Sequence, residues 1–155
     1  LIKDGGAGAV KIEGGTQVSK HTQTLVNYGI PVLGHVGLTP QSFHQLSGYK
    51  IQGKTLEDAQ KIIDDANAVE DSGAFAVVLE CIPQELAEDI TGRLTIPTIG
   101  IGSGKKCDGQ IQVFHDVIGF SKETAPKHAQ TYDNMYAKIS SIIGQYKADV
   151  EDTNV

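Results

Sequence analysis

The chain has 155 residues, a net charge of −6 and 39% hydrophobic residues, which is ordinary for a globular protein. This length suits one domain with a sizeable core, and the acidic balance without a basic block argues against a nucleic-acid partner. No apolar run is long enough to span a bilayer and no signal-peptide pattern opens the chain, so we expect no membrane partner.

The first third of the sequence alternates helical and extended patterns. Residues 1–9, LIKDGGAGA, read as the end of a helix that turns through glycines, which indicates a fragment of a longer chain. A short strand follows at 9–13, then a weak helix at 16–29 that stops at a glycine. A second strand is predicted at 30–37. The polar, glycine-rich stretch 38–54 is predicted to be a loop, and its length is typical of a functional loop.

The middle of the sequence continues the same alternation. Residues 55–73 carry an apolar stripe at helical spacing behind a capping pattern, and they give the clearest helix. The unbroken apolar run 74–80 predicts a buried strand. A helix is expected at 83–94, with a proline in its first turn, and a strand that ends in glycines at 96–104. The last strand is predicted at 110–119.

The C-terminal part is predicted to be an amphipathic helix at 126–147, followed by a frayed acidic tail at 148–155. Alternating strands and helices predict an α/β fold with a parallel sheet of about five strands. We expect residues 1–147 to belong to one domain. No GxGxxG follows the first strand, so a dinucleotide-binding fold lacks its signature.

The cysteines and histidines do not form a metal-binding pattern. Cys81 and Cys107 lie far apart without CxxC spacing, so we expect free thiols in a reducing compartment. The five histidines include neither HExxH nor an HxH pair, which gives no support to a zinc site.

Polar groups recur where the predicted strands end. Lys11 and Glu13 close the first strand, His35 lies at the end of the second, Glu80 ends the third, and GIGSG at 100–104 follows the fourth. In parallel α/β folds the carboxyl ends of the strands meet at one edge, where ligands bind. The coincidence of four such ends is a stronger signal of a site than any single residue.

Each group also has a plain structural explanation. Lys11 and Glu13 could form a surface pair worth less than about 1 kcal/mol. His35 could be a satisfied structural histidine, and the glycines of 100–104 could form either a phosphate cradle or a simple turn. Glu80 could reach water from a strand end, although its desolvated position after six apolar residues suits a general base.

Together these groups form a chemically coherent set. A carboxylate suits a hard metal ion, an ammonium suits an anionic substrate, and a second carboxylate suits proton abstraction. A metal-bound 2-oxo acid has an acidified proton beside its carbonyl, because the ion stabilises the charge that develops.

Four segments resemble the ketopantoate hydroxymethyltransferase family, in the same order along residues 1–140. They are VKIEGG (10–15), GHVGLTPQS (34–42), QGKTLEDAQKIIDDANAVEDSGAFAVVLECIP (52–83) and IPTIGIGSGKKCDGQIQVFHDVIG (96–119). GHVGLTPQS and the IPTIGIGxGxxCDGQ pattern are highly specific in combination.

The resemblance implies a (β/α)8 TIM barrel of the phosphoenolpyruvate/pyruvate superfamily type, of which this chain holds about the last five strands. The implied reaction transfers a one-carbon unit from 5,10-methylenetetrahydrofolate to 3-methyl-2-oxobutanoate through a Mg²⁺-chelated enolate, giving 2-dehydropantoate. In this chain Lys11 and His35 match substrate-binding positions, Glu13 matches a metal ligand, and Glu80 matches the proton acceptor.

The resemblance also implies parts that these residues do not contain. The family's other metal aspartates and an oxo-acid-binding serine lie on earlier strands. The remainder therefore belongs to a longer chain or comes from another chain, or the segment is a truncated, non-catalytic remnant. A related superfamily lyase acting on another 2-oxo acid is a further alternative. Large homo-oligomers, commonly decamers, and a cytoplasmic or mitochondrial location are implied by the family alone.

Overall fold

The structure is a computed structural model that describes residues 1–42, 50–122, 126 and 128–152. The chain forms two compact units, Leu1–Ile111 and Gln112–Val155. The first unit contains, in chain order, α1 (Ile2–Gly5), β1 (Val10–Glu13), η1 (Thr16–Val18), α2 (Ser19–Asn27), β2 (Val32–Gly37), η2 (Pro40–Ser42), α3 (Leu56–Asp71), β3 (Ala76–Glu80), α4 (Gln84–Arg93), β4 (Thr98–Ile101) and β5 (Gly109–Gln110).

The five strands form one sheet in the order β1-β2-β3-β4-β5, and every neighbouring pair is parallel. Neighbours in space are thus neighbours in sequence, which is the strand order of a β/α barrel wall. The predicted α/β class and the partial barrel are confirmed. Of the predicted loop at 38–54, residues 43–49 lie outside the described part of the chain.

Helix α3 begins and packs as its sequence indicates. The Thr55 hydroxyl accepts a hydrogen bond from the Asp58 amide at 3.1 Å, which satisfies one of the free N–H groups at the helix start. The apolar stripe turns inward and is buried, at Ile62, Ile63, Ala66 and Val69. The predicted helix at 55–73 is therefore confirmed to within two residues.

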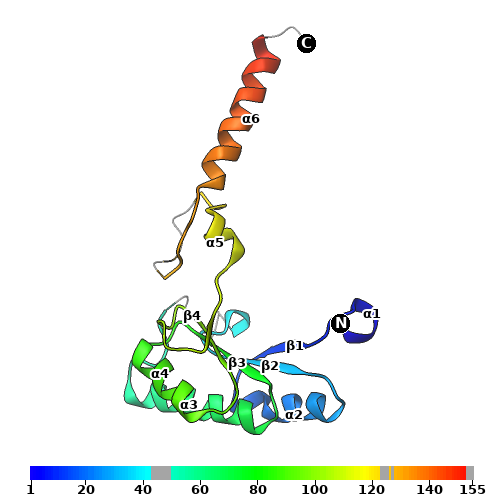
Figure 1. Cartoon of the computed structure of the whole chain (residues 1–155), viewed down its shortest axis with the longest axis vertical. Coiled ribbons are helices and arrows are strands. Elements are labelled where there is room, and N and C mark those ends of the chain that lie inside the picture. The colour runs from blue at the N-terminus through cyan, green and yellow to red at the C-terminus, as the bar shows by residue number, and fades with distance from the viewer. Residues whose placement is uncertain (43–49, 123–125, 127, 153–155) are drawn as a thin grey trace. The chain divides into compact units, whose positions relative to one another are not determined.

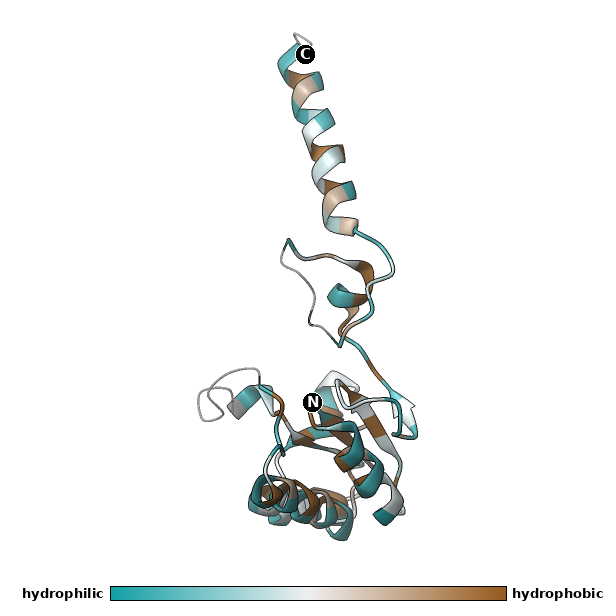
Figure 2. Cartoon of the chain, turned by 90° about the vertical axis from the view of Figure 1, so that its left-hand side faces the viewer, coloured by the Kyte–Doolittle hydropathy of each residue, from teal (hydrophilic) through white to brown (hydrophobic). Residues whose placement is uncertain are grey.

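The two faces of the sheet differ in chemistry. Helices α2, α3 and α4 lie along one side of the strands (Figure 1), and the hydrophobic core fills the space between, with Val36, Val77 and Leu79 contributed by the sheet. Figure 2 shows the same helices with hydrophilic outer surfaces. Because side chains alternate along a strand, residues next to these core positions point to the opposite face, and His35 and Glu80 are among them.

The C-terminal part of the chain differs from the sequence prediction at three points. The strand expected at 110–119 is wrong beyond Gln110, because Phe114–Ile118 forms the short helix α5, which ends where Gly119 takes a left-handed conformation at φ 63°. The helix expected at 126–147 is α6 (Met135–Asp152), which starts later because Asn134 Oδ1 caps it by accepting from the Ala137 amide at 2.9 Å.

Residues 148–152 continue helix α6, where the sequence predicted a frayed tail, and the last three residues lie outside the described part. No residue of α5 or α6 is buried. Among the described helices, none combines the length and apolar character that crossing a membrane requires.

Candidate active site

Strand β1 presents an ammonium and a carboxylate on one face. Lys11 and Glu13 are two residues apart, and their Nζ and Oε1 atoms are 3.9 Å apart. The other oxygen of Glu13, Oε2, accepts a hydrogen bond from the Gln41 backbone amide at 2.9 Å. The lysine side chain is 48% exposed and the glutamate side chain 13%. The carboxylate is therefore fixed, while the ammonium has room to reach a ligand.

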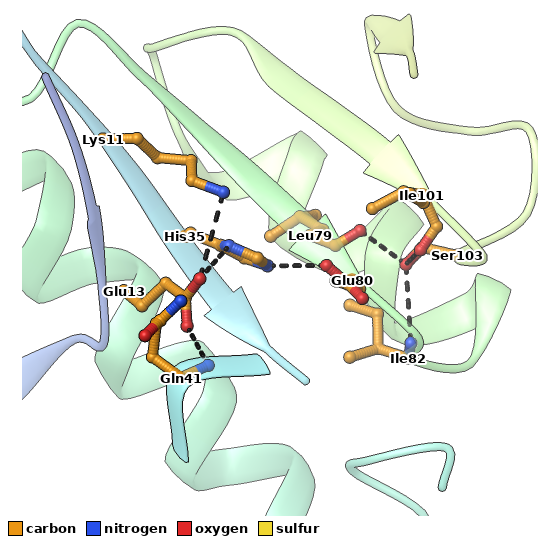
Figure 3. Close-up of polar contacts among 9 residues, drawn as sticks. All are labelled: Lys11, Glu13, His35, Gln41, Leu79, Glu80, Ile82, Ile101 and Ser103. Atoms are coloured by element: carbon orange, nitrogen blue, oxygen red, sulfur yellow. Dashed lines mark hydrogen bonds and ion pairs between the residues drawn. The ribbon is translucent and has the colours of Figure 1, made fainter. Parts of the chain in front are cut away.

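His35 joins this pair to the next strands. It lies beside Glu13 in the β1–β2 register, and its Nδ1 is 3.7 Å from Glu13 Oε1. On the other side of the ring, Nε2 is 3.0 Å from Glu80 Oε2 (Figure 3). The residue is only 1% exposed, and within the described residues neither ring nitrogen makes a hydrogen bond of linear geometry. A buried ring that touches two carboxylates without such bonds is costly for stability, which is typical of a functional position.

Glu80 ends strand β3 after the buried residues 76–79. Its side chain is 16% exposed, and its backbone carbonyl accepts from the Leu38 amide at 2.8 Å. The carboxylate thus leaves a rigid strand end toward His35. The next residue, Cys81, is no rival nucleophile, because burial, reinforced by the Glu80 charge, raises the pKa of its thiol.

The GIGSG segment at 100–104 forms a turn in which Gly102 and Gly104 have positive φ angles of 64° and 76°. Between them, Ser103 is fully buried, and its hydroxyl donates to the Leu79 carbonyl at 2.7 Å. This geometry favours the turn over the phosphate cradle that the sequence also allowed.

The structure brings together all four residues that the sequence singled out, Lys11, Glu13, His35 and Glu80 (Figure 3). Sequence reasoning gave no role to Ser103 or to the Gln41 amide. A polar residue between the two glycines that follow strand β4 was the signal available for Ser103. The amide could not be found, because any residue type offers the same backbone N–H.

Asp108, in the CDGQ motif, was also missed. Its Oδ2 atom accepts from the Thr98 amide at 2.8 Å and from the Thr98 hydroxyl at 3.0 Å, and these bonds lower the pKa of the Asp108 carboxyl. They tie β5 to the start of β4. Nearby, burial raises the pKa of the Cys107 thiol, and both cysteines are free, as the sequence predicted.

Glu13 has the chemistry of a ligand for a hard cation, but the described residues do not form a complete metal site. They contain no group of three or more His, Cys, Asp or Glu side chains that could hold a metal ion. Glu13 nevertheless presents one carboxylate oxygen toward the Lys11 and His35 side, while its other oxygen is held by the Gln41 amide. One or two carboxylates plus substrate oxygens are the usual protein ligands of Mg²⁺. A single carboxylate fits such a site when further ligands come from outside this chain.

Comparisons with known proteins identify the family of the chain. The family model described as ketopantoate hydroxymethyltransferase matches residues 1–155. The chain is 52% identical to proteins named 3-methyl-2-oxobutanoate hydroxymethyltransferase from Geobacter metallireducens, over 97% of the chain and 57% of the relative, and from Carboxydothermus hydrogenoformans, over 98% and 55%. A relative from Dehalococcoides mccartyi is also 52% identical, over 97% of the chain and 54% of its own length. The chain thus spans about half the length of the relatives that it matches, and it belongs to the ketopantoate hydroxymethyltransferase family.

Proposed function

We propose that this chain is the C-terminal part of an enzyme that transfers a hydroxymethyl group from 5,10-methylenetetrahydrofolate to 3-methyl-2-oxobutanoate, giving 2-dehydropantoate. The observation that carries the proposal is that Glu13 and Glu80 flank the buried His35 ring, with Lys11 beside Glu13, in a chain that belongs to this family. These groups match the needs of the reaction, which are to hold an anionic oxo acid and to remove a proton from carbon.

Glu80 is the proposed proton acceptor. The proton on C3 of the oxo acid passes to a Glu80 oxygen, and the electron pair left on C3 becomes the carbon nucleophile. That carbon then bonds to the one-carbon unit of the folate. In the balanced reaction, both bonds from this unit to the folate nitrogens break, a water molecule supplies the hydroxyl oxygen, and tetrahydrofolate leaves with one proton from water and one from C3. The position of Glu80 supports this role, since its carboxylate is 16% exposed at the end of a buried strand and is restrained on one side by the His35 ring.

Lys11 and Glu13 are proposed to bind the oxo acid end of the substrate. The Lys11 ammonium, half exposed on the same face, pairs with the substrate carboxylate. Glu13 contributes one ligand to Mg²⁺, which when bound stabilises negative charge on the substrate's keto oxygen. The Gln41 amide holds the Glu13 carboxylate in the orientation needed for that task.

His35 is proposed to lie against the substrate while it separates the two carboxylates. Its two ring nitrogens face Glu13 and Glu80, so one buried side chain sets the spacing between the binding group and the base. A rigid spacing matters, because proton transfer requires the base within hydrogen-bond reach of the substrate.

The remaining strands of the barrel, the other metal ligands and the folate site are proposed to come from residues outside this chain. The chain accounts for 57% of the length of the G. metallireducens relative, which leaves ample sequence for three more strands. A homo-oligomer, a decamer by family resemblance, and a cytoplasmic location belong to the same proposal.

The test is formation of 2-dehydropantoate from the two substrates with Mg²⁺. We would assay the 155-residue chain alone and mixed with the N-terminal part of the G. metallireducens relative, which supplies the absent strands. Product in the mixture that disappears with Glu80→Gln would support the proposal. A correctly folded mixture without product would identify the segment as a non-catalytic remnant.

A further inference from the structure

The backbone at the end of strand β3, at Glu80 and Cys81, makes hydrogen bonds to three other segments. The Glu80 carbonyl accepts from the Leu38 amide, the Cys81 amide donates to the Ile101 carbonyl, and the Cys81 carbonyl accepts from the Gln52 amide, each at 2.8 Å. All three bonds join main chain to main chain. They come from different segments, so the peptide units after Glu80 are fixed from several sides.

Ser103 adds a link from a side chain to the backbone of this segment. Its hydroxyl donates to the Leu79 carbonyl at 2.7 Å and accepts from the Ile82 amide at a longer 3.4 Å (Figure 3). One buried oxygen therefore bridges the residue before Glu80 and the second residue after it. The serine is fully buried, so water does not replace either bond.

Cys81, enclosed by this bridge, has a strained backbone. Its φ angle is 51°, and it is the one non-glycine residue with positive φ in the described part of the chain. Side chains other than glycine rarely adopt this conformation, which persists only where the surroundings enforce it. The strain lies directly beside the carboxylate that the proposed reaction uses as its base.

We propose that Ser103 is a positioning residue for Glu80, which acts by clamping the strained turn at Cys81. The Ser103 hydroxyl holds the two ends of the turn together, and the turn sets the direction in which the Glu80 side chain leaves the strand. The catalytic part of this inference rests on the proposed function, whereas the clamp itself does not.

Loss of the hydroxyl has a specific expected consequence. Without it the Ile82 amide loses the bond to Ser103, the Leu79 carbonyl loses the bond that it accepts from the serine, and Cys81 is free to relax toward negative φ. A shift of about 1 Å at a catalytic group is enough to cost about 100-fold in rate. Because Ser103 touches no substrate, the loss falls on the rate of the chemical step and leaves substrate affinity unchanged.

The clamp is tested first by amide hydrogen exchange in the 155-residue chain. Ser103→Ala is expected to speed exchange at the Ile82 amide about tenfold or more relative to the Ala87 amide on helix α4. Ser72→Ala is the matched control, because Ser72 is also buried and its hydroxyl also donates to a backbone carbonyl, that of Ala68. In a Cys81→Gly background, where positive φ carries no strain, the effect of Ser103→Ala is expected to shrink.

The positioning role is tested by kinetics in the assembled enzyme. Ser103→Ala is expected to lower kcat about tenfold with KM unchanged, whereas Ser72→Ala leaves both constants unchanged. Unchanged exchange at Ile82, or an unchanged kcat, would overturn the inference. An inactive wild type would instead refute the proposed function, and the exchange experiment would still decide whether Ser103 clamps the turn.

Discussion

His35 Nε2 lies 3.0 Å from Glu80 Oε2, and the histidine is only 1% exposed. The contact joins the middle of β2 to the end of β3, so it depends on the register that places Gly37 beside Glu80. A buried ring in this position restrains the carboxylate of the proposed base. The other ring nitrogen faces Glu13, so one side chain links the proposed base to the proposed metal ligand.

Replacement of this ring should impair catalysis more than folding. We expect His35→Leu, which keeps an apolar body in the site, to lower kcat about 100-fold, because the Glu80 base loses the ring that restrains it and base catalysis is worth about this factor. His21→Leu, on the exposed face of α2, is the control and should leave kcat unchanged. Steady-state kinetics would measure both variants, and a His35→Leu enzyme with wild-type kcat would refute the role.

The Lys11 ammonium should contribute to binding of the oxo acid. Lys11→Gln keeps most of the side-chain length but removes the charge, so we expect KM for 3-methyl-2-oxobutanoate to rise about tenfold, the equivalent of one charge-assisted hydrogen bond. Lys61→Gln, on the far side of the helix layer, serves as the control. An unchanged KM in Lys11→Gln would mean that Lys11 forms no more than a surface pair with Glu13.

Gly34 on β2 lies so close to α3 that a side chain would not fit. A Cβ atom there would fall 2.3 Å from Val69 Cγ1. We expect Gly34→Ala to lower the free energy of unfolding by about 2 kcal/mol, measured by urea denaturation. The loss should shrink in a Val69→Ala background, which removes the clashing methyl groups.

Gly92, on the exposed side of α4 with open space around it, is the control for this substitution. Gly92→Ala should raise the free energy of unfolding by about 0.5 kcal/mol, because alanine favours the helix. Equal effects of Gly34→Ala in the two Val69 backgrounds would contradict the packing explanation.

Glu70 should make stability depend on pH. Its Oε1 atom accepts hydrogen bonds from the Thr95 hydroxyl and from the Thr95 and Ile96 amides, and these bonds lower the pKa of the Glu70 carboxyl. A lowered pKa in the folded state stabilises the protein fully above the unfolded-state value of about 4.3. That contribution disappears as the pH falls through the lower pKa of the folded state.

Glu70→Gln should therefore cost about 1 kcal/mol of unfolding free energy at pH 7, after allowance for solvent screening, and much less at pH 3. Glu57→Gln, at an exposed position on the same helix, should change stability little at either pH. Denaturation curves at the two pH values would measure this difference, and a loss of equal size at both would exclude the ionised carboxylate as its source.

Strong local patterns made most of the fold predictable. The helical spacing of the apolar residues from Ile62 to Val69 predicted helix α3 and its buried face. The unbroken apolar run before Glu80 predicted strand β3. The segment 110–119 was mistaken for a strand because alternating apolar residues at Ile111 and Val113 mimic strand periodicity. The left-handed Gly119 that closes a helix there has no signature beyond the glycine itself.

The individual residues of the site could be predicted from the sequence, but the contacts between them could not. Polar residues at strand ends identified Glu13 and Glu80, because parallel strands place their carboxyl ends at one edge. The sequence could not show that His35 touches both, since contact across strands depends on register. Nor could it reveal the buried Ser103 bridge, which depends on how the turn after β4 folds back on β3.

The most direct test of the account is exchange of the C3 proton of 3-methyl-2-oxobutanoate for deuterium, followed by proton NMR in D₂O with Mg²⁺ and without folate. The assembled wild-type enzyme should catalyse the exchange. Glu80→Gln should slow it by about 100-fold or more. The control variant Glu88→Gln, which changes an exposed carboxylate on α4, should leave the rate unchanged. Exchange by Glu80→Gln at the wild-type rate would contradict the assignment of Glu80 as the base.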